Sequence, residues 1–243
     1  MKFSSKGENE MGDIRNKILT ISGDPRSGKS TIVKCLVQIL ENMGYEVRIY
    51  ESGIKFRDIS QRRYSKMYPD RIDAKQADIQ SDEEFAKERD KIDKEVDDWL
   101  KGLGNEINSE DTPNVIYIVD SRLAFHYMNA DSFDACITVN DKVEAGMRAY
   151  KDKSKGPQDS YDTPEEAIIH TLARALAEIE RFAEKGINKN DPNNFDYIKD
   201  TSHVTLQELP QLAREIYERA MQFWRLKGIE KSKSTTDRED DER

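Results

Sequence analysis

The chain has 243 residues, of which 36% are hydrophobic and 36% are charged, and its formal net charge is −9. No apolar run approaches the roughly 20 residues that a membrane-spanning helix requires, so this composition excludes an integral membrane protein. The negative charge disfavours a general nucleic-acid-binding protein, because such a protein needs a basic face to displace counterions from phosphates. A chain of this length can bury one sizeable core, and we expect one domain.

The first 17 residues lack the apolar stretch of a signal peptide, and we expect a cytoplasmic protein. Cys35 and Cys136 fall in apolar segments, which favours buried thiols over a disulfide framework or a zinc site. Residues 1–16 and 230–243 are polar and bury too little apolar surface to offset the entropy of ordering them. We therefore predict disordered tails around a single domain over residues 17–229.

Between the tails, short β-rich runs alternate with amphipathic helical segments, which is the pattern of a parallel sheet covered on both faces. We predict a three-layer α/β fold around a central five-stranded parallel sheet. The predicted strands are Lys17 to Ser22, Glu46 to Glu51, Val115 to Asp120, Ala135 to Asn140 and Tyr197 to Lys199.

The first helix follows the first strand, and its apolar stripe ends before Gly44, a residue typical of helix ends. Capping-box patterns predict three later helix starts. Their paired residues are Ser81 with Glu84, Thr163 with Glu166, and Thr205 with Glu208, and we expect the first two helices to end before Gly102 and Gly186. Pro210 is expected to loosen the first turn of the third. Residues 52–112 form a largely helical insertion between the second and third strands.

The strongest motif lies where the first strand ends. The segment fits G-x-x-x-x-G-K-[ST] without a gap, between a strand and an amphipathic helix, so its backbone N–H groups would face the phosphates of ATP. Lys29 would reach the β and γ phosphates, and Ser30 would hold Mg²⁺. A plain glycine turn is disfavoured, because chance matches rarely fall in this context. The nine residues are Gly23, Asp24, Pro25, Arg26, Ser27, Gly28, Lys29, Ser30 and Thr31.

The apolar run from Val115 ends in Asp120, as a Walker B strand ends in an acid. Such a carboxylate could orient water on Mg²⁺. Many core strands also end in aspartate, so the strand end alone leaves a structural role equally open.

Further segments resemble the cytidylate kinases, particularly the archaeal type, over roughly residues 17–225. They are ISGDPRSGKST, SGIKFR at 52–57, DSRLA at 120–124, ERF at 180–182 with GI at 186–187, and NFDYIKDTS at 194–202. The resemblance implies a nucleoside monophosphate kinase with a P-loop NTPase fold, which uses ATP and Mg²⁺ to phosphorylate CMP or dCMP. Its partner would be a small nucleotide, with neither nucleic acid nor membrane, and a monomer is favoured.

In the family, the arginines that match Arg57 and Arg122 face the acceptor nucleotide, and the resemblance places Gly53 and Asp97 in the same acceptor site. Both arginines lie just past a predicted strand end, where open α/β sheets bind ligands, and a guanidinium matches phosphate oxygens. Each arginine alone would be assigned to the solvated surface. For Asp97, which lies four residues after Asp93, a solvated helix face is the favoured alternative.

Arg174 and Arg181 are seven residues apart and share one face of the helix that follows Thr163. In the resembling kinases, arginines at this spacing point toward the transferring phosphoryl group. The resemblance therefore implies that they act in catalysis together with Lys29 and Asp120. Two solvated arginines would show the same spacing.

The sequence departs from the family in its lid, residues 141–162, which carries lysines where the family is rich in arginine. Gly146 stands about where an arginine is usual, and Ser121 replaces the glycine of the DSRLA segment. Ala175 and Ala177 replace polar residues. These departures keep two alternatives open: a P-loop kinase for another small acceptor, and a nucleotide-binding regulatory protein with weakened transfer activity.

Overall fold

The computed structural model describes residues 16–71, 74, 79, 82–110, 112–128, 131–152 and 160–229. The predicted tails up to residue 15 and from residue 230, the predicted cap Ser81, and the part of the lid at 153–159 lie outside these residues. Within them, no helix is long and apolar enough to cross a membrane.

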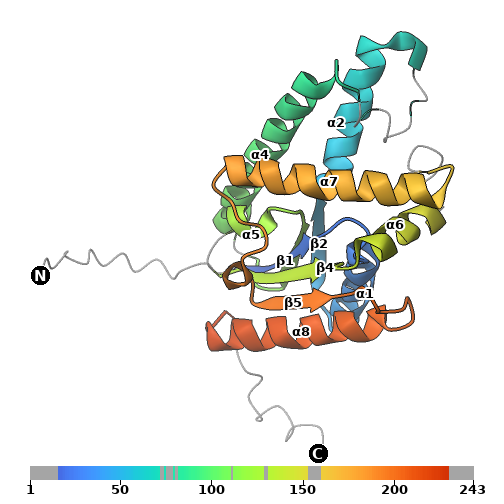
Figure 1. Cartoon of the computed structure of the whole chain (residues 1–243). Helices are drawn as coiled ribbons and strands as arrows, with labels where there is room; N and C mark the ends of the chain where they lie inside the picture. The colour runs from blue at the N-terminus through green and yellow to red at the C-terminus, as the bar shows by residue number, and fades with distance from the viewer. Residues whose placement is uncertain are drawn as a thin grey trace, which may run out of the picture.

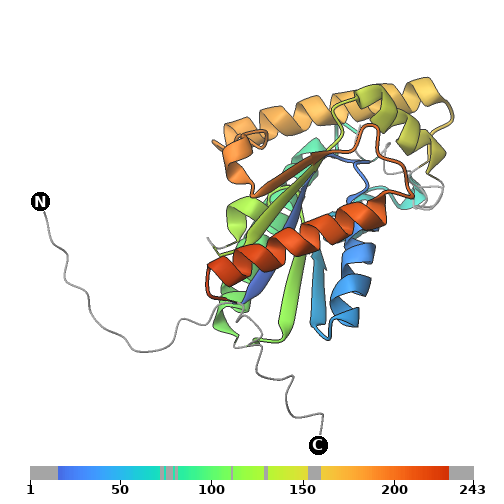
Figure 2. The same ribbon diagram turned by 90° about the horizontal axis from the view of Figure 1, so that it is seen from below.

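A five-stranded parallel sheet forms the centre of the molecule, as predicted, with the strand order β2-β3-β1-β4-β5 (Figures 1 and 2). The predicted bounds of β4 were wrong, because the strand lies two residues nearer the N-terminus. The amides of Val139 and Asn140 bond to the carboxylates of Asp24 and Asp200 instead of continuing the strand ladder. The strands are β1 (Lys17–Gly23), β2 (Glu46–Glu51), β3 (Val115–Asp120), β4 (Phe133–Thr138) and β5 (Tyr197–Asp200).

Helices cover both faces of the sheet, which gives the predicted three layers. On one face, α1 (Lys29–Asn42) and α8 (Leu209–Leu226) pack on alternate residues of β1 and β4. On the other face, α2 (Ser52–Met67), α4 (Ala86–Ser109) and α5 (Ala124–Tyr127) pack on the intervening residues of β1 and β3. Since neighbouring strand residues point to opposite faces, the fully buried β1 contributes to both cores.

The predicted end of α4 before Gly102 was wrong, because the helix continues through Gly102 and Gly104 to Ser109. Leu103 and Ile107 are buried against the sheet, so the apolar face of the helix extends past both glycines. Tertiary packing outweighs the roughly 1 kcal/mol helix penalty of each glycine. The described part of the insertion is largely helical, as predicted, and it includes a short 3₁₀ turn at Pro69–Arg71.

The predicted cap at Thr205 was also misplaced, because α8 begins at Leu209. The carboxylate of Glu208 accepts hydrogen bonds from the backbone N and the Oγ1 of Thr205 and closes a turn ahead of the helix. Pro210 then lies in the first turn, where its missing N–H costs no hydrogen bond.

The prediction for α7 (Pro164–Glu184) is confirmed, since Thr163 Oγ1 accepts a hydrogen bond from the amide of Glu166 at 3.1 Å. Gly186 adopts a left-handed φ of 71° two residues after the helix. A second 3₁₀ turn, at Pro192–Asn194, precedes β5.

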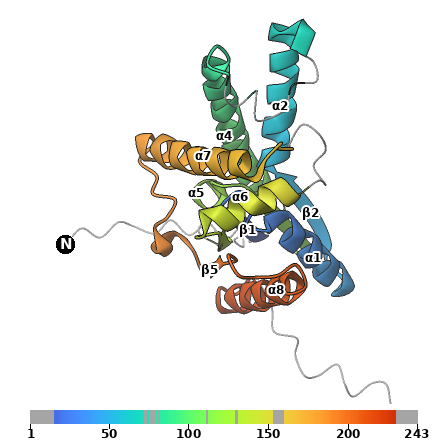
Figure 3. The ribbon, with the colours of Figure 1, turned by 45° about the vertical axis from the view of Figure 1, so that its right-hand side comes forward.

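In the described part of the lid, α6 (Lys142–Lys151) packs closely against α7 (Figure 3). A Cβ atom at Gly146 would lie 2.5 Å from Ile168 Cα, which is far inside van der Waals contact. The absence of a side chain at position 146 therefore has a packing cause, and an arginine does not fit there in this fold.

The N-terminal boundary of the domain lies at least one residue earlier than predicted. Asn16 is 2% exposed, and its Nδ2 donates to the carbonyls of Ile107 and Glu110 at the end of α4. Its Oδ1 accepts from Thr112 Oγ1 at 3.0 Å. Asn16 thus ties the start of β1 to the loop before β3.

Candidate active site

The phosphate loop begins at Gly23, the last residue of β1. Gly23 has a φ of 124°, and a Cβ there would lie 1.9 Å from the carbonyl oxygen of Ile137 on β4. The amide of Asp24 donates to the same carbonyl at 3.0 Å. Gly28, with a φ of 88°, caps α1, and its carbonyl accepts from the amides of Thr31 and Ile32. The amides that precede these at a helix start generally lack carbonyl partners within the helix. The loop and helix end together offer a site for an anion.

The ammonium group of Lys29 lies inside this loop. Its Nζ donates to the carbonyls of Gly23, at 3.0 Å, and Asp24, at 2.6 Å. Burial lowers the pKa of Lys29, while the charge of Asp120 opposes the shift. Ser30 and Thr31 are exposed at the start of α1. The predicted phosphate-binding cation is therefore held where the phosphate loop would receive its ligand.

The predicted metal ligands fit a nucleotide-bound ion better than a protein-only site. Asp120 ends β3 opposite Ile21 in register, at the carboxyl edge of the sheet, and acts electrostatically on Lys29. In the described ranges, no group of three or more His, Cys, Asp or Glu side chains could hold a metal ion. Mg²⁺ commonly takes one or two protein ligands and completes its shell with phosphate oxygens and water. Ser30 and Asp120 suit that arrangement.

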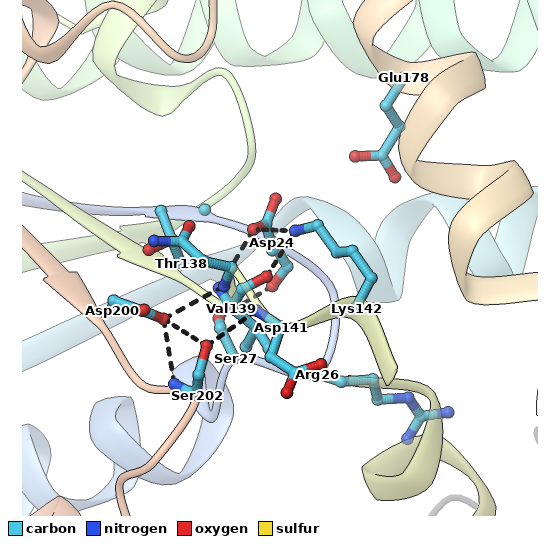
Figure 4. A network of polar contacts seen from close by, with 12 residues as sticks. Asp24, Arg26, Ser27, Thr138, Val139, Asp141, Lys142, Glu178, Asp200 and Ser202 are labelled. Carbon is cyan, nitrogen blue, oxygen red and sulfur yellow. Dashed lines mark hydrogen bonds and ion pairs between the residues drawn. The ribbon is translucent and has the colours of Figure 1, made fainter. Parts of the chain in front are cut away.

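Asp24 has a role that the motif alone does not predict. Its Oδ2 accepts from the Nζ of Lys142 at 2.8 Å and from the amide of Val139 at 3.1 Å (Figure 4). Its Oδ1 accepts from the Nζ of Lys189 at 3.2 Å. Burial opposes ionisation, but the hydrogen bond from Lys142 and the charge of Lys189 hold the pKa of Asp24 below its usual value. The carboxylate thus ties the phosphate loop to α6 and to the segment after α7.

Glu178 on α7 forms the centre of a second ion-pair cluster. Its side chain is 4% exposed, and its Oε1 lies 2.5 Å from Arg122 Nη1 and 3.3 Å from Arg174 Nε. Its Oε2 lies 3.6 Å from Lys189 Nζ. Burial opposes its charge, yet Arg122 and Arg174 hold the pKa of Glu178 below its usual value. The predicted residues Arg122 and Arg174 therefore meet on one buried carboxylate.

Sequence reasoning missed both Glu178 and Lys189. Glu178 lies four residues after Arg174 and three before Arg181, so helical spacing places it on the same face and could have indicated it. Lys189 belongs to no motif, and only the tertiary fold brings it to Asp24.

The remaining predicted residues lie at different distances from this cluster. Arg181 pairs with Asp93 on α4, and its charge also acts on Glu178. Arg57 lies on α2 beside Gly53, with its Nη1 3.5 Å from the position of a Cβ at Gly53. No hydrogen bond or ion pair joins Arg57 to another described residue. The structure brings Lys29, Asp120, Arg122, Arg174 and Arg181 into electrostatic contact, and leaves Arg57 and Gly53 on the insertion.

Asp97 is not simply solvated, because it pairs with Lys185 at the end of α7. The pair lines a cavity of about 550 Å³ between α4, α5 and α7, and Arg181 also faces this cavity. Burial and the charge of Asp97 raise the pKa of Tyr127, another lining residue, to about 12. The predicted acceptor residue Asp97 thus shares a cavity with the predicted catalytic residue Arg181.

Arg148, the only arginine of the lid segment, has a structural position. Its Nη2 donates to the carbonyls of Thr201, at 2.6 Å, and Ser202, at 3.2 Å, just after β5. Arg26 of the phosphate loop, with a φ of 64°, pairs with Asp152 after α6 at 2.7 Å. The lid is therefore tied to the phosphate loop, and its arginine is already engaged.

No protein-family model matches the sequence, and a search of curated proteins finds no match. Solved structures do match. An uncharacterized protein from Eubacterium ventriosum is 11% identical with a TM-score of 0.50, over 84% of this chain and 99% of that chain. A shikimate kinase from Acinetobacter baumannii, in complex with shikimate, is 13% identical with a TM-score of 0.42, over 84% and 94% of the two chains. A shikimate kinase from Bacteroides thetaiotaomicron is 13% identical with a TM-score of 0.44, over 83% and 98%.

Only the first of these structures reaches a TM-score of 0.50, and at 11% identity the likeness concerns the fold alone. The sheet order, the two helical layers and the phosphate loop between β1 and α1 define a three-layer P-loop NTPase fold. None of the matches reported above is described as a cytidylate kinase.

Proposed function

We propose that this protein transfers the γ-phosphoryl group of ATP to a nucleoside monophosphate, with CMP or dCMP as the preferred acceptor. The observation that supports this most is that Arg122 and Arg174 both pair with the buried carboxylate of Glu178, and that the charge of Arg122 acts on Lys29 in the phosphate loop. The choice of CMP or dCMP rests on the resemblance of residues 52–57 and 120–124 to cytidylate kinases.

Because the transition state of phosphoryl transfer is loose, the protein contributes mainly by positioning the two substrates and stabilising negative charge, and little by covalent chemistry. Lys29 and the N–H groups of the phosphate loop would hold the β and γ phosphates of the donor. Mg²⁺, when bound at Ser30 and Asp120, would neutralise charge between those phosphates. Arg174 and Arg181 would stabilise the charge that develops on the transferred group, and Arg122 would hold the acceptor.

Arginine substitutions on the acceptor side test the proposal. Replacing Arg57 with Ala should weaken CMP binding about ten- to a hundredfold, the scale of one charge-assisted bidentate contact, while MgATP affinity stays within about twofold. Arg57 is the cleaner site, because Arg122→Ala also removes a partner of buried Glu178. Arg57→Lys should rescue only part of the loss.

Calorimetric titration with CMP, dCMP, UMP and AMP provides the measurement, with Arg219→Ala on α8 as the control. Arg219 pairs with Glu215 on its own helix, on the face opposite the insertion, so CMP affinity should not change. A wild-type protein that hydrolyses ATP and binds none of the four monophosphates would refute the proposed acceptor class.

A P-loop kinase for another small acceptor is the second candidate. Two observations favour it: Arg57 has no contact with the Glu178 cluster, and Arg148 is engaged by the carbonyls after β5. A coupled ADP-release assay over monophosphates and small hydroxyl acceptors separates the candidates. ADP release with a hydroxyl acceptor and with no monophosphate would favour the second. ATP binding without transfer to any of them would favour a regulatory protein.

A further inference from the structure

Lys189 connects two poorly exposed carboxylates that belong to different parts of the candidate site. Its Nζ lies 3.2 Å from Asp24 Oδ1 in the phosphate loop and 3.6 Å from Glu178 Oε2 on α7. The exposed fractions of the Lys189, Asp24 and Glu178 side chains are 11%, 13% and 4%. Lys189 lies between α7 and the 3₁₀ turn at Pro192–Asn194, outside every motif.

We propose that Lys189 is a positioning residue that couples the phosphate loop to the arginines of α7. Through the Asp24–Lys189–Glu178 bridge, the affinity of the phosphate loop for its nucleotide depends on the charge state and partners of Glu178. The coupling of ATP binding to an acceptor rests on the proposed function, because it takes the acceptor to be a nucleoside monophosphate. The dependence of ATP binding on Glu178 does not rest on it.

The bridge can couple the two sites without being needed for folding. Asp24 also accepts from Lys142 and Val139, and Glu178 also pairs with Arg122, so each carboxylate keeps a partner when Lys189 is removed. Among the described residues, what is lost is the cation that lies within ion-pair distance of both carboxylates. Charges on poorly exposed groups interact more strongly than charges in water. A change in the charge or partners of Glu178 therefore alters the strength of the ion pair between Lys189 and Asp24.

The direction of the coupling follows from charge. An acceptor phosphate that draws Arg122 and Arg174 away from Glu178 leaves that carboxylate more dependent on Lys189. The ion pair between Lys189 and Asp24 then weakens, and the affinity of the phosphate loop for the nucleotide changes. By thermodynamic reciprocity, the nucleotide in the loop changes acceptor affinity by the same factor.

A double-mutant cycle read out as the Kd of MgATP tests the bridge without any acceptor. The four proteins are wild type, Glu178→Gln, Lys189→Met and the double variant. Glu178→Gln should change the Kd roughly fivefold in the wild-type background, at the low end of known site–site couplings, and less than twofold when Lys189 is Met. Lys189→Arg should retain most of the coupling. Equal effects of Glu178→Gln in both backgrounds would overturn the proposal.

Lys227→Met is the matched control, because Lys227 also pairs with an aspartate, Asp131, but lies after α8 away from the loop. Its cycle with Glu178→Gln should be additive. A purely structural role for Lys189 would lower the melting temperature of Lys189→Met and leave the effects on MgATP additive. If Lys189→Met does not fold, Lys189→Gln replaces it in the cycle.

A second arm measures the MgATP Kd with and without saturating CMP. Wild type should show a ratio that differs from one by at least threefold, and Lys189→Met should bring the ratio within about 1.5-fold of one. An unchanged ratio in Lys189→Met would count against the bridge. A wild-type protein that binds MgATP and no monophosphate contradicts the proposed function, and the cycle on MgATP alone still decides the role of Lys189.

Discussion

The close contact between α6 and α7 makes a prediction about Gly146 that can be worked from the structure. A Cβ at this position would lie 2.5 Å from Ile168 Cα and 2.6 Å from Ile168 Cγ1. One of these atoms is backbone and cannot rotate away, so the two helices must separate. Replacing a helical glycine with alanine otherwise gains up to about 1 kcal/mol.

Overpacking of a tight interface costs roughly 1–3 kcal/mol, and we expect the cost at Gly146 to exceed the helix gain. Gly146→Ala should therefore destabilise the protein by about 1–2 kcal/mol, which corresponds to a melting temperature lower by roughly 2–8 °C in a domain of this size. Gly102 on α4 is the matched control, since a Cβ there would meet no atom within 4 Å. Gly102→Ala should stabilise the protein by about 0.5–1 kcal/mol.

Urea denaturation of wild type and the two alanine variants measures both changes, and Ile168→Ala in the Gly146→Ala background tests the cause. Because alanine keeps Cα and Cβ, this second change should not restore stability. If Gly146→Ala stabilised the protein as much as Gly102→Ala, α6 and α7 would not approach as closely as the structure shows, and the packing reason for the missing lid arginine would fail.

Three further predictions address the site, the ends of the domain and pH. Lys29→Ala should lower the rate of phosphoryl transfer by orders of magnitude. If the variant turned over at the wild-type rate, the assignment of residues 23–31 as a phosphate loop would be wrong. Deleting residues 1–10 or 232–243 should leave the melting temperature nearly unchanged, whereas Asn16→Ala should lower stability by about 1–3 kcal/mol, because Asn16 bonds to the end of α4. Burial raises the pKa of Asp134 to about 7, so the folded protein binds this proton more tightly than the unfolded chain does, and stability falls as pH rises from about 4 to 7. Asp134→Asn should remove this dependence of the unfolding free energy on pH and stabilise the protein at pH 8 by on the order of 1–2 kcal/mol. Urea titrations of both proteins at pH 5 and pH 8 measure the change. An unchanged pH dependence in Asp134→Asn would show that Asp134 is not its cause.

The sheet and the phosphate loop could be predicted because their signals are local. The strands are short runs rich in β-formers next to turns or glycines, and the loop motif has fixed spacing between β1 and α1. The predicted ends of α4 and β4 were wrong because tertiary contacts, not local sequence, determine where these elements end. Burial of Ile107 carries α4 past two glycines, and the carboxylate of Asp24 takes the amide of Val139 out of the strand ladder.

The candidate site was predictable in its residue types and only partly in its geometry. Helical spacing placed Arg174 and Arg181 on one face of α7, and the structure adds that Glu178 lies between them as a buried counterion. Local sequence patterns contain no information on contacts between residues 165 positions apart, such as Asp24 and Lys189. Such contacts depend on how α7 crosses the carboxyl edge of the sheet.

The net charge of the chain and the charge of the site have opposite signs, and this difference bears on function. The whole chain carries −9. The ion-pair cluster on Asp24 and Glu178, taken with Lys29 and Asp120, has five cations and three carboxylates, a formal charge of +2 for these eight groups; they are Lys29, Arg122, Arg174, Lys142 and Lys189 against Asp24, Asp120 and Glu178. Within this cluster the cations outnumber the carboxylates, which favours a polyanionic ligand even though the whole protein is acidic. Because the packing of Gly146 excludes an arginine and Arg148 is engaged, these cations come from the phosphate loop, the end of β3, α7 and the lysines bound to Asp24, not from lid arginines.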